Sequence, residues 1–314
     1  MELSPHKAVG AQRPMNSAET EAAIFEDSEP RRSLGASAVA VFGQNTLALV
    51  GLAMVAAFFL FCFVGPLVYH TNQVATAVAQ ANRPPTAAHL LGTDAVGYDE
   101  LGRLMVGGQI TLLVAVAVAV LATTIGLIWG CVAGVSGGGL DSLMMRIVDA
   151  ALAIPGLFLL IFLDSILKPS VLVLIMVITA LAWLVPSRLV RAEVLSLRQR
   201  PFVEAARGAG ATGVWVILRH LIPNVFGTVV VNATFQVADA VLTVAALSFL
   251  GLGIPPPAAN WGSMLANGVN YVFAGYWWQI WPAGVCIVAV VVGFNFIGDG
   301  LRDTVDVRMR AGRS

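Results

Sequence analysis

Long apolar runs dominate this chain and limit what it can fold into. A helix of about 20 apolar residues is long enough to cross the hydrocarbon core of a bilayer. Six such runs are present, over 46–69, 109–133, 143–166, 170–190, 225–250 and 280–299. Only 11% of the residues are charged and 58% are apolar, whereas soluble domains carry about 25% charged residues. We therefore expect an all-α membrane protein with six transmembrane helices.

The remaining segments divide the chain into a polar tail, a membrane domain and a second, shorter tail. Residues 1–35 carry many charged side chains and no apolar run that could form a core, so we expect them to be disordered. Because the first apolar run starts only near Thr46, we expect no cleavable signal peptide. The membrane domain should cover residues 36–300, and residues 301–314 should form a cytoplasmic tail.

Residue types that bind metals or perform catalysis are sparse and far apart. The cysteines each lie inside an apolar run and are expected to pack as small hydrophobic side chains: Cys62, Cys131 and Cys286. The four histidines lack the spacing of a metal site. The glycine-rich segment 134–139 lacks the lysine of a nucleotide-binding P-loop, and no catalytic set of side chains is visible. We expect no catalytic, cofactor-binding or metal-binding residue in this chain.

The basic residues are divided unevenly between the two sides of a six-span topology. If the N-terminus lies inside the cell, fifteen of the eighteen Lys and Arg residues face the cytoplasm, leaving Arg83, Arg103 and Lys168 outside. Cytoplasmic segments of membrane proteins carry this excess of positive charge. Both termini and the segment 191–224 are therefore predicted to be cytoplasmic. Because the net charge is zero, nothing favours a nucleic-acid partner.

The segment 191–224 is a polar island between two apolar spans, and its residues predict a short helix. Pro201 suits the first helical turn, where its missing N–H has no partner in any case. Glu204 falls in the same turn, where the helix dipole favours a carboxylate. Gly208 and Gly210 are expected to end the helix. Helix and segment together would form a knob at the membrane surface.

The surface of this knob is open to two interpretations. Ala205 and Ala206 leave one helix face almost bare, and such a face can fit closely against another protein. Thr212 can cap a second short helix, which we expect to stop before Pro223. A solvated loop between spans is the plainer interpretation. We favour a docking element, because small apolar residues serve no purpose in a solvated loop.

The motif Glu204-Ala205-Ala206, followed by Gly210 and a later Pro223, resembles the EAA loop of ABC-importer permeases. Other stretches, in the same order and spacing, are similar to the C-type permease subunit of dipeptide and oligopeptide importers. They are Leu91-Gly92-Thr93-Asp94 and residues 246–253, 261–265 and 298–303. Together these stretches span about two thirds of the chain.

The resemblance implies a type I importer permease fold with a cytoplasmic coupling helix. It implies that the chain works with a second permease subunit, two cytoplasmic ATPase subunits and an extracytoplasmic substrate-binding protein in a bacterial inner membrane. ATP and Mg²⁺ would be bound by the ATPase subunits, so this chain would not itself be an enzyme. The ATPase-coupling residues would be Glu204, Ala205, Ala206, Gly210 and Pro223.

The sequence departs from the branch pattern at several positions, which bear on the cargo. Tyr98 stands where branch members often have Arg, Val244 where many have Glu, and Val307 where a Pro is usual. The loop ends in His220-Leu221-Ile222-Pro223, where the wider family has Ile-x-Leu-Pro. Short peptides are the expected cargo, and nickel complexes, glutathione or haem remain alternatives.

The fifth apolar run carries a polar stripe that is independent of any resemblance. Its members recur at intervals of three or four residues: Thr228, Asn232, Gln236, Asp239 and Thr243. At about 100° per residue they share one helix face, which should avoid lipid because polar groups are costly there. The face could line a translocation path or form a helix–helix contact. We favour a path lined by Asn232, Gln236, Asp239 and Thr243.

Two further expectations concern charge and class. Asp149 lies three residues after Arg146 on the third predicted span, and we expect these two side chains to form an ion pair. A self-sufficient secondary transporter or channel is the alternative function, although six spans without an inverted repeat are few for a transporter. A membrane enzyme is a weaker alternative, since the chain shows no catalytic set.

Overall fold

The structure is a computed structural model that describes residues 41–168 and 170–311. Its helices in this part of the chain confirm the all-α prediction, and the single β-bridge, between Thr93 and Asp99, is isolated. The predicted tail at residues 1–35 lies outside the described residues.

The helices follow one another with short connections, apart from one long loop after α4. The α-helices are α3 (Thr46–Phe63), α4 (Gly65–Val68), α5 (Glu100–Ser136), α6 (Gly138–Leu152), α7 (Gly156–Ile166), α8 (Val171–Ala182), α9 (Leu184–Leu197), α10 (Pro201–Gly208), α11 (Gly213–Val216), α12 (Ile222–Phe249), α13 (Trp261–Val269) and α14 (Trp281–Ala311). Short 3-10 helices cover Val78–Gln80, Val272–Ala274 and Trp277–Gln279.

Four of these helical segments are long and apolar enough to cross a membrane, and two bent helix pairs bring the number to as many as six. The third predicted span is α6 followed by α7, which bend by 81° just before Pro155 and the start of α7. The fourth is α8 followed by α9, with a bend of 41°. Each break lies near a proline, Pro155 in the first pair and Pro186 in the second. Proline lacks the N–H that a straight helix requires, which favours a bend at these places.

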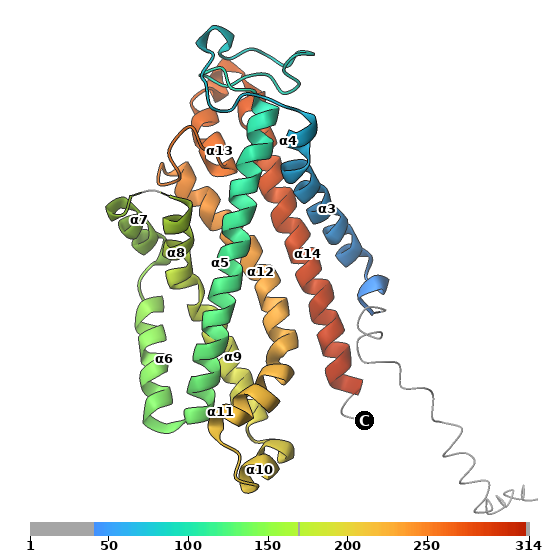
Figure 1. Cartoon of the computed structure of the whole chain (residues 1–314), viewed down its shortest axis with the longest axis vertical. Coiled ribbons are helices and arrows are strands. Elements are labelled where there is room, and N and C mark those ends of the chain that lie inside the picture. Colours follow the sequence, from blue (N-terminus) through green and yellow to red (C-terminus); the bar gives the residue numbers. More distant parts are fainter. Residues whose placement is uncertain (1–40, 169, 312–314) are drawn as a thin grey trace, which may run out of the picture.

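The long helices stand side by side in one bundle, with α5, α12 and α14 at its centre (Figure 1). The helices α6 to α8 flank the bundle on one side and α3 on the other. At one end lie α10 and α11, together with the end of α14. At the opposite end lie α13 and the loop between α4 and α5.

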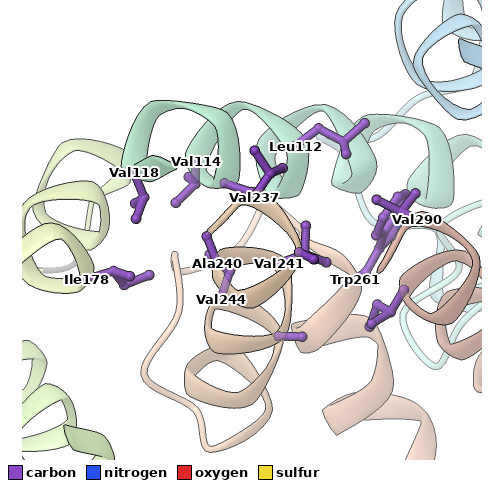
Figure 2. Packing of buried hydrophobic residues seen from close by; sticks show 14 of the residues in the cluster. Leu112, Val114, Val118, Ile178, Val237, Ala240, Val241, Val244, Trp261 and Val290 are labelled. Carbon is purple, nitrogen blue, oxygen red and sulfur yellow. The ribbon is translucent and has the colours of Figure 1, made fainter. Parts of the chain in front are cut away.

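The main core lies where α5 and α12 cross (Figure 2). Leu112, Val114 and Val118 of α5 face Val237 and Val241 of α12 across this contact, and all are buried. Because lipid tails are as apolar as these side chains, close packing rather than the hydrophobic effect holds such helices together.

Trp261 closes the core near α13. Its side chain is fully buried, and its indole N–H donates to the backbone carbonyl of Leu104 over 2.9 Å. The buried indole therefore has its hydrogen-bond partner, and it ties α13 to the first turns of α5.

A stripe of glycines on α5 lets α9 approach closely. Gly126, Gly130 and Gly134 recur every four residues and so lie on one face of α5. A Cβ at Gly126 would come within 2.6 Å of the Pro186 side chain, and one at Gly130 within 2.6 Å of the Ser187 carbonyl oxygen. Small residues at this spacing are typical of tight helix pairs in membranes.

Two ion pairs hold α6 against α9. The Arg191 guanidinium donates to both carboxylate oxygens of Asp141, over 2.5 and 2.7 Å. Asp149 pairs with Arg188. The predicted pairing of Asp149 with Arg146 is therefore wrong, because the packing of α6 on α9 offers a partner on the neighbouring helix.

The start of α12 also differs from the sequence prediction. We expected the second short helix of the polar island to stop before Pro223. Instead α11 continues through a π-helical turn at Ile217–Leu221 directly into α12, where Pro223 is the second residue. Proline is tolerated in a first helical turn, and the wider π turn ahead of it absorbs the change in register. The helical run from Gly213 to Phe249 is therefore continuous enough to act as one span.

Candidate functional site

The predicted site residues fall into two regions of the molecule. The coupling residues belong to α10 and to the segments around it at one end of the bundle (Figure 1). The polar stripe runs along α12 within the bundle.

One buried side chain fixes α10 to the bundle. The helix begins at Pro201 as predicted, and Val203 is fully buried in a second apolar cluster with Val190 and Val194 of α9. Glu204 and Ala205 on the same helix are exposed. The helix is thus anchored through its inner face, and its outer face is exposed.

Small side chains beside α10 form a surface pocket of about 450 Å³. It is lined by Ala206, Ala209, Gly210, Ala211, Thr212 and Trp215. The chain turns sharply at Gly210, whose φ of +88° suits glycine and strains other residues. The Thr212 hydroxyl then accepts from the Trp215 backbone N–H over 3.3 Å and caps α11, as predicted.

An aromatic group borders this pocket and was not predicted. The His220 ring lies 5.0 Å from the Trp215 ring and 5.8 Å from the Phe202 ring, measured between centroids. Trp215 is 47% and Phe202 41% exposed. Of the predicted coupling residues, Ala206 and Gly210 line the pocket, while Pro223 does not.

The predicted path residues come together in a pocket of about 380 Å³. Asn232, Gln236, Asp239 and Thr243 all line it from α12. The rest of its wall is largely apolar and comes from α5, α7, α8 and α9, for example Val118, Leu157, Leu160, Ile178 and Val185. Asp239 is exposed, whereas the neighbouring Val237 is buried on the opposite side of the helix.

The stripe divides between pocket and helix contacts. The Gln236 side-chain amide donates to the Ala182 carbonyl over 2.6 Å, and the Thr228 hydroxyl donates to a Glu193 carboxylate oxygen over 3.0 Å. The Thr243 hydroxyl donates to the Asp239 carbonyl of its own helix over 2.8 Å. Helix contacts therefore hold Thr228 and Gln236, and Gln236 also lines the pocket; a translocation path along this face stays a prediction.

A second pocket of about 380 Å³ lies between α9, α12 and α14. It is lined by Leu189, Thr228, Val231, Asn232, Phe235, Arg302 and Val305. Asn232 and Phe235 line both pockets, so they form the wall between them. The Asn232 side-chain oxygen is buried and has no hydrogen-bond partner among the described residues.

The loop between α4 and α5, at the other end of the bundle, is held by a polar cluster that sequence reasoning missed. Asp99 caps α5 by accepting from the Gly102 backbone N–H over 2.8 Å. Its other oxygen accepts from the Tyr69 hydroxyl over 2.9 Å and lies 2.9 Å from His89 Nδ1. Partial burial and the bond to Asp99 raise the pKa of Tyr69. An Asp directly before an apolar helix is a signal for such a cap.

Neighbouring contacts add to this cluster. The Arg103 guanidinium lies 4.1 Å from the centre of the Tyr98 ring and 3.7 Å from an Asp94 oxygen. The Trp278 indole and the Gln279 amide both donate to the Thr93 carbonyl. The loop is thus tied to α5 and to the segment ahead of α14. Within the described residues, no group of three or more His, Cys, Asp or Glu residues could hold a metal ion.

Comparison with known families gives two matches. Residues 122–311 match the family described as binding-protein-dependent transport system inner membrane component. Residues 33–85 match the N-terminal transmembrane domain of oligopeptide transport permease C.

Curated proteins with similar sequences are permeases. The oligopeptide transport system permease protein OppC of Bacillus subtilis is 37% identical over 279 residues, which is 88% of this chain and 91% of the relative. A putative peptide permease protein of Brucella suis is 43% identical over 85% of this chain and 89% of the relative. The dipeptide transport system permease protein DppC of Bacillus subtilis is 35% identical over 85% of this chain and 83% of the relative.

A solved structure shares the fold. A chain of the MetNI methionine ABC transporter, in inward facing conformations, aligns with 64% of this chain and 94% of its own length. The TM-score is 0.50 and the sequence identity 22%. The fold of a permease from an ABC transporter therefore accommodates the helices described above.

Proposed function

The chain belongs to the family of binding-protein-dependent transport system inner membrane components, as the sequence resemblance implied, and on that premise we propose that it forms half of a translocation pathway for short peptides. It is a multi-pass membrane protein and a permease subunit of an ABC importer. Peptides are the proposed cargo because the similar curated proteins carry the names of peptide permeases.

The observation that carries the pathway proposal is the pocket on α12. Its predicted path residues share one cavity with the bend between α8 and α9. A polar, partly open face at membrane depth must meet water, cargo or another protein, because lipid would not solvate it. A second permease subunit lying against this face would complete the pathway.

We assign coupling to ATP hydrolysis to the exposed surface around α10, at the end of the bundle. Glu204, Ala205, Ala206 and Gly210 lie on or beside the exposed face of α10, and Pro223 opens α12. Two cytoplasmic ATPase subunits would bind there, and they would hold ATP and Mg²⁺ and perform the hydrolysis. This chain would bind no cofactor. An extracytoplasmic binding protein would deliver cargo to the end that carries α13.

The orientation rests on charge. With α10 and both termini in the cytoplasm, most Lys and Arg residues face the side where such residues are enriched. The end with α13 and the loop before α5 then faces outward, where a cluster of Trp and Tyr residues precedes α14. Aromatic side chains of this kind favour the membrane interface.

Transport by the reconstituted complex tests the proposal. The chain is expressed together with the second permease, the ATPases and the binding protein of its transporter, and the complex is placed in vesicles. We expect ATP-dependent uptake of labelled short peptides, and no uptake when the ATPase subunits are inactive. Uptake of a nickel complex, glutathione or haem in place of peptides would overturn the cargo. Uptake by the lone chain without ATP would indicate a secondary transporter or channel.

A further inference from the structure

The bend between α8 and α9 borders the pocket on α12. α8 ends at Ala182 and α9 begins at Leu184, with Trp183 between them and an angle of 41°. Ala182 and Val185, on either side of this break, both line the pocket. The geometry of the break therefore determines the shape of the pocket wall.

Pro186 explains why a carbonyl at this break needs a partner. In a continuous helix the carbonyl of residue 182 would accept from the N–H of residue 186. Residue 186 is a proline and has no N–H to give. The next carbonyl, that of Trp183, still accepts from the Ser187 N–H over 3.1 Å. Pro186 thus leaves the Ala182 carbonyl without its helical donor.

Gln236 supplies the missing donor from another helix. Its side-chain nitrogen lies 2.6 Å from the Ala182 oxygen, although the two residues are 54 positions apart. At membrane depth an unsatisfied carbonyl is costly, and a side chain from a neighbouring helix can satisfy it. A glutamine at this place replaces the backbone donor that the proline removes.

The two sides of the break are held differently. On the α9 side, Pro186 and Ser187 pack against the glycine stripe of α5, with approach distances too short for a larger residue. On the α8 side, Leu172 and Met176 are each 61% exposed, so one face of this helix has no packing partner in the described chain. The opposite face of α8, with Leu174, Val177 and Ile178, is buried in the main core, so α8 is packed on one face only.

We infer that Gln236 is a positioning residue that fixes the angle of α8 on α9 by donating to the Ala182 carbonyl that Pro186 leaves free. In doing so it sets the width of the pocket between α8 and α12. The consequence for transport rests on the proposed function of this pocket; the effect on the angle does not.

The angle can be measured with paired spin labels in the assembled complex. Labels are placed on Met176 of α8 and Leu189 of α9, which are 61% and 37% exposed, after the buried native cysteines are replaced by alanine. We expect Gln236→Leu to broaden the distance distribution about twofold, since a helix without its bond at a proline bends freely.

A second substitution identifies the carbonyl as the cause. Pro186→Ala restores a backbone N–H and keeps the Cβ that packs against α5. In this background the Ala182 carbonyl has its own donor, and Gln236→Leu should change the distribution no further. A merely structural role for Gln236 would give the same change in both backgrounds. Asn232→Leu, one turn away on the same pocket wall, is the matched control and should leave the distribution unchanged.

The outcomes separate this inference from the proposed function. Equal distributions for the wild type and Gln236→Leu, or an equal broadening in the Pro186→Ala background, would overturn the role of Gln236. If the distances respond as expected but the wild-type complex moves no peptide, the role of Gln236 at the break is supported and the proposed peptide cargo is wrong. Where both hold, peptide uptake should fall about tenfold in Gln236→Leu, as expected for a misplaced site.

Discussion

Small residues serve opposite purposes in α5 and around α10. On α5, a Cβ added at Gly126, Gly130 or Gly134 would come within 2.6 Å of α9. Beside α10, a Cβ added at Gly208 or Gly210 would meet no atom of the described residues within 4 Å. The first set is filled by the chain itself, and the second faces open space.

This difference distinguishes small residues that allow two helices of the chain to pack from small residues that leave a surface open to a partner. A small residue in contact with its own chain lets two helices approach and contributes to folding. A small residue with nothing against it contributes little to folding and leaves room for another molecule, which we propose to be an ATPase subunit at α10. The same contrast applies to side chains on α10, where Val203 is fully buried and Ala205 is exposed. Substitutions on the two helices should therefore damage different properties of the protein.

The largest effect is expected for Gly130→Leu on α5. The new side chain would collide with the Ser187 carbonyl and the Val190 side chain, which lie 2.6 and 2.8 Å from where its Cβ would stand. Overpacking of this kind costs about 3 kcal/mol, and more where backbone must move. We expect loss of the monodisperse peak in detergent gel filtration and a lower melting temperature.

Gly208→Leu is the matched control, because it adds the same side chain where a Cβ meets open space. It should keep the gel-filtration peak and remain within about 0.5 kcal/mol of the wild-type stability, as surface changes do. Equal damage from both substitutions would show that the contrast between α5 and α10 has no energetic basis.

The second effect concerns coupling and rests on the proposed function. Ala206→Glu places a charge in the pocket beside α10, and Gly210→Trp fills it and strains a residue with φ of +88°. Both should leave the permease folded and assembled in the membrane. Stimulation of the partner ATPases by cargo should drop at least about tenfold. A filled docking surface should weaken ATPase binding by about 1.4 kcal/mol or more, which corresponds to a tenfold loss of affinity.

Gly139→Trp provides the comparison for Gly210→Trp. Gly139 also faces open space, near the start of α6 at the same end of the bundle. Stimulation should be retained there. Normal stimulation in both Ala206→Glu and Gly210→Trp would refute α10 as the coupling element.

A smaller effect is expected for Asp239→Leu on the pocket face of α12. Asp239 is exposed, so its carboxylate contributes little to packing, and the complex should stay assembled. Peptide uptake or the preference among peptides should change about tenfold or less. If the subunits instead separate, with a loss of about 1–3 kcal/mol of assembly energy, the carboxylate is a buried interface partner rather than part of a path.

The smallest perturbation tests which end faces the cytoplasm. A cysteine at Phe273, which is fully exposed among the Trp and Tyr residues ahead of α14, should react with an impermeant thiol reagent added outside intact cells. A cysteine at Val214 of α11, where the side chain is 67% exposed, should react only after the cells are opened and the ATPases are removed. The reverse pattern would place α10 outside and exclude cytoplasmic ATPases as its partners.

Local sequence signals predicted much of the fold and part of the site. The apolar runs predicted where helices cross the bundle, and Pro201 and Gly210 predicted the bounds of α10 to within two residues. The spacing of the stripe predicted that Asn232, Gln236, Asp239 and Thr243 share one face, which the pocket confirms as geometry. Their role in transport stays a prediction.

Non-local contacts could not be predicted in the same way. Asp149 pairs with Arg188 of α9 rather than with Arg146, which is nearer in the sequence. The helix that contains Pro223 continues from α11 through a π turn, without a break before the proline. The glycine stripe of α5 is visible in the sequence, but its partner, α9, is not. The aromatic group at His220 joins residues that lie on separate short helices.

A bundle of membrane helices with a short helix at one end follows from the amino-acid sequence alone. That much is local, because lipid requires each span to be long, apolar and bonded within its own backbone. Which side chains supply the hydrogen bonds that a bent helix loses depends instead on how the helices pack. The bond from Gln236 to the Ala182 carbonyl requires α12 to lie beside the break, and a pattern within one helix carries no information about its neighbour.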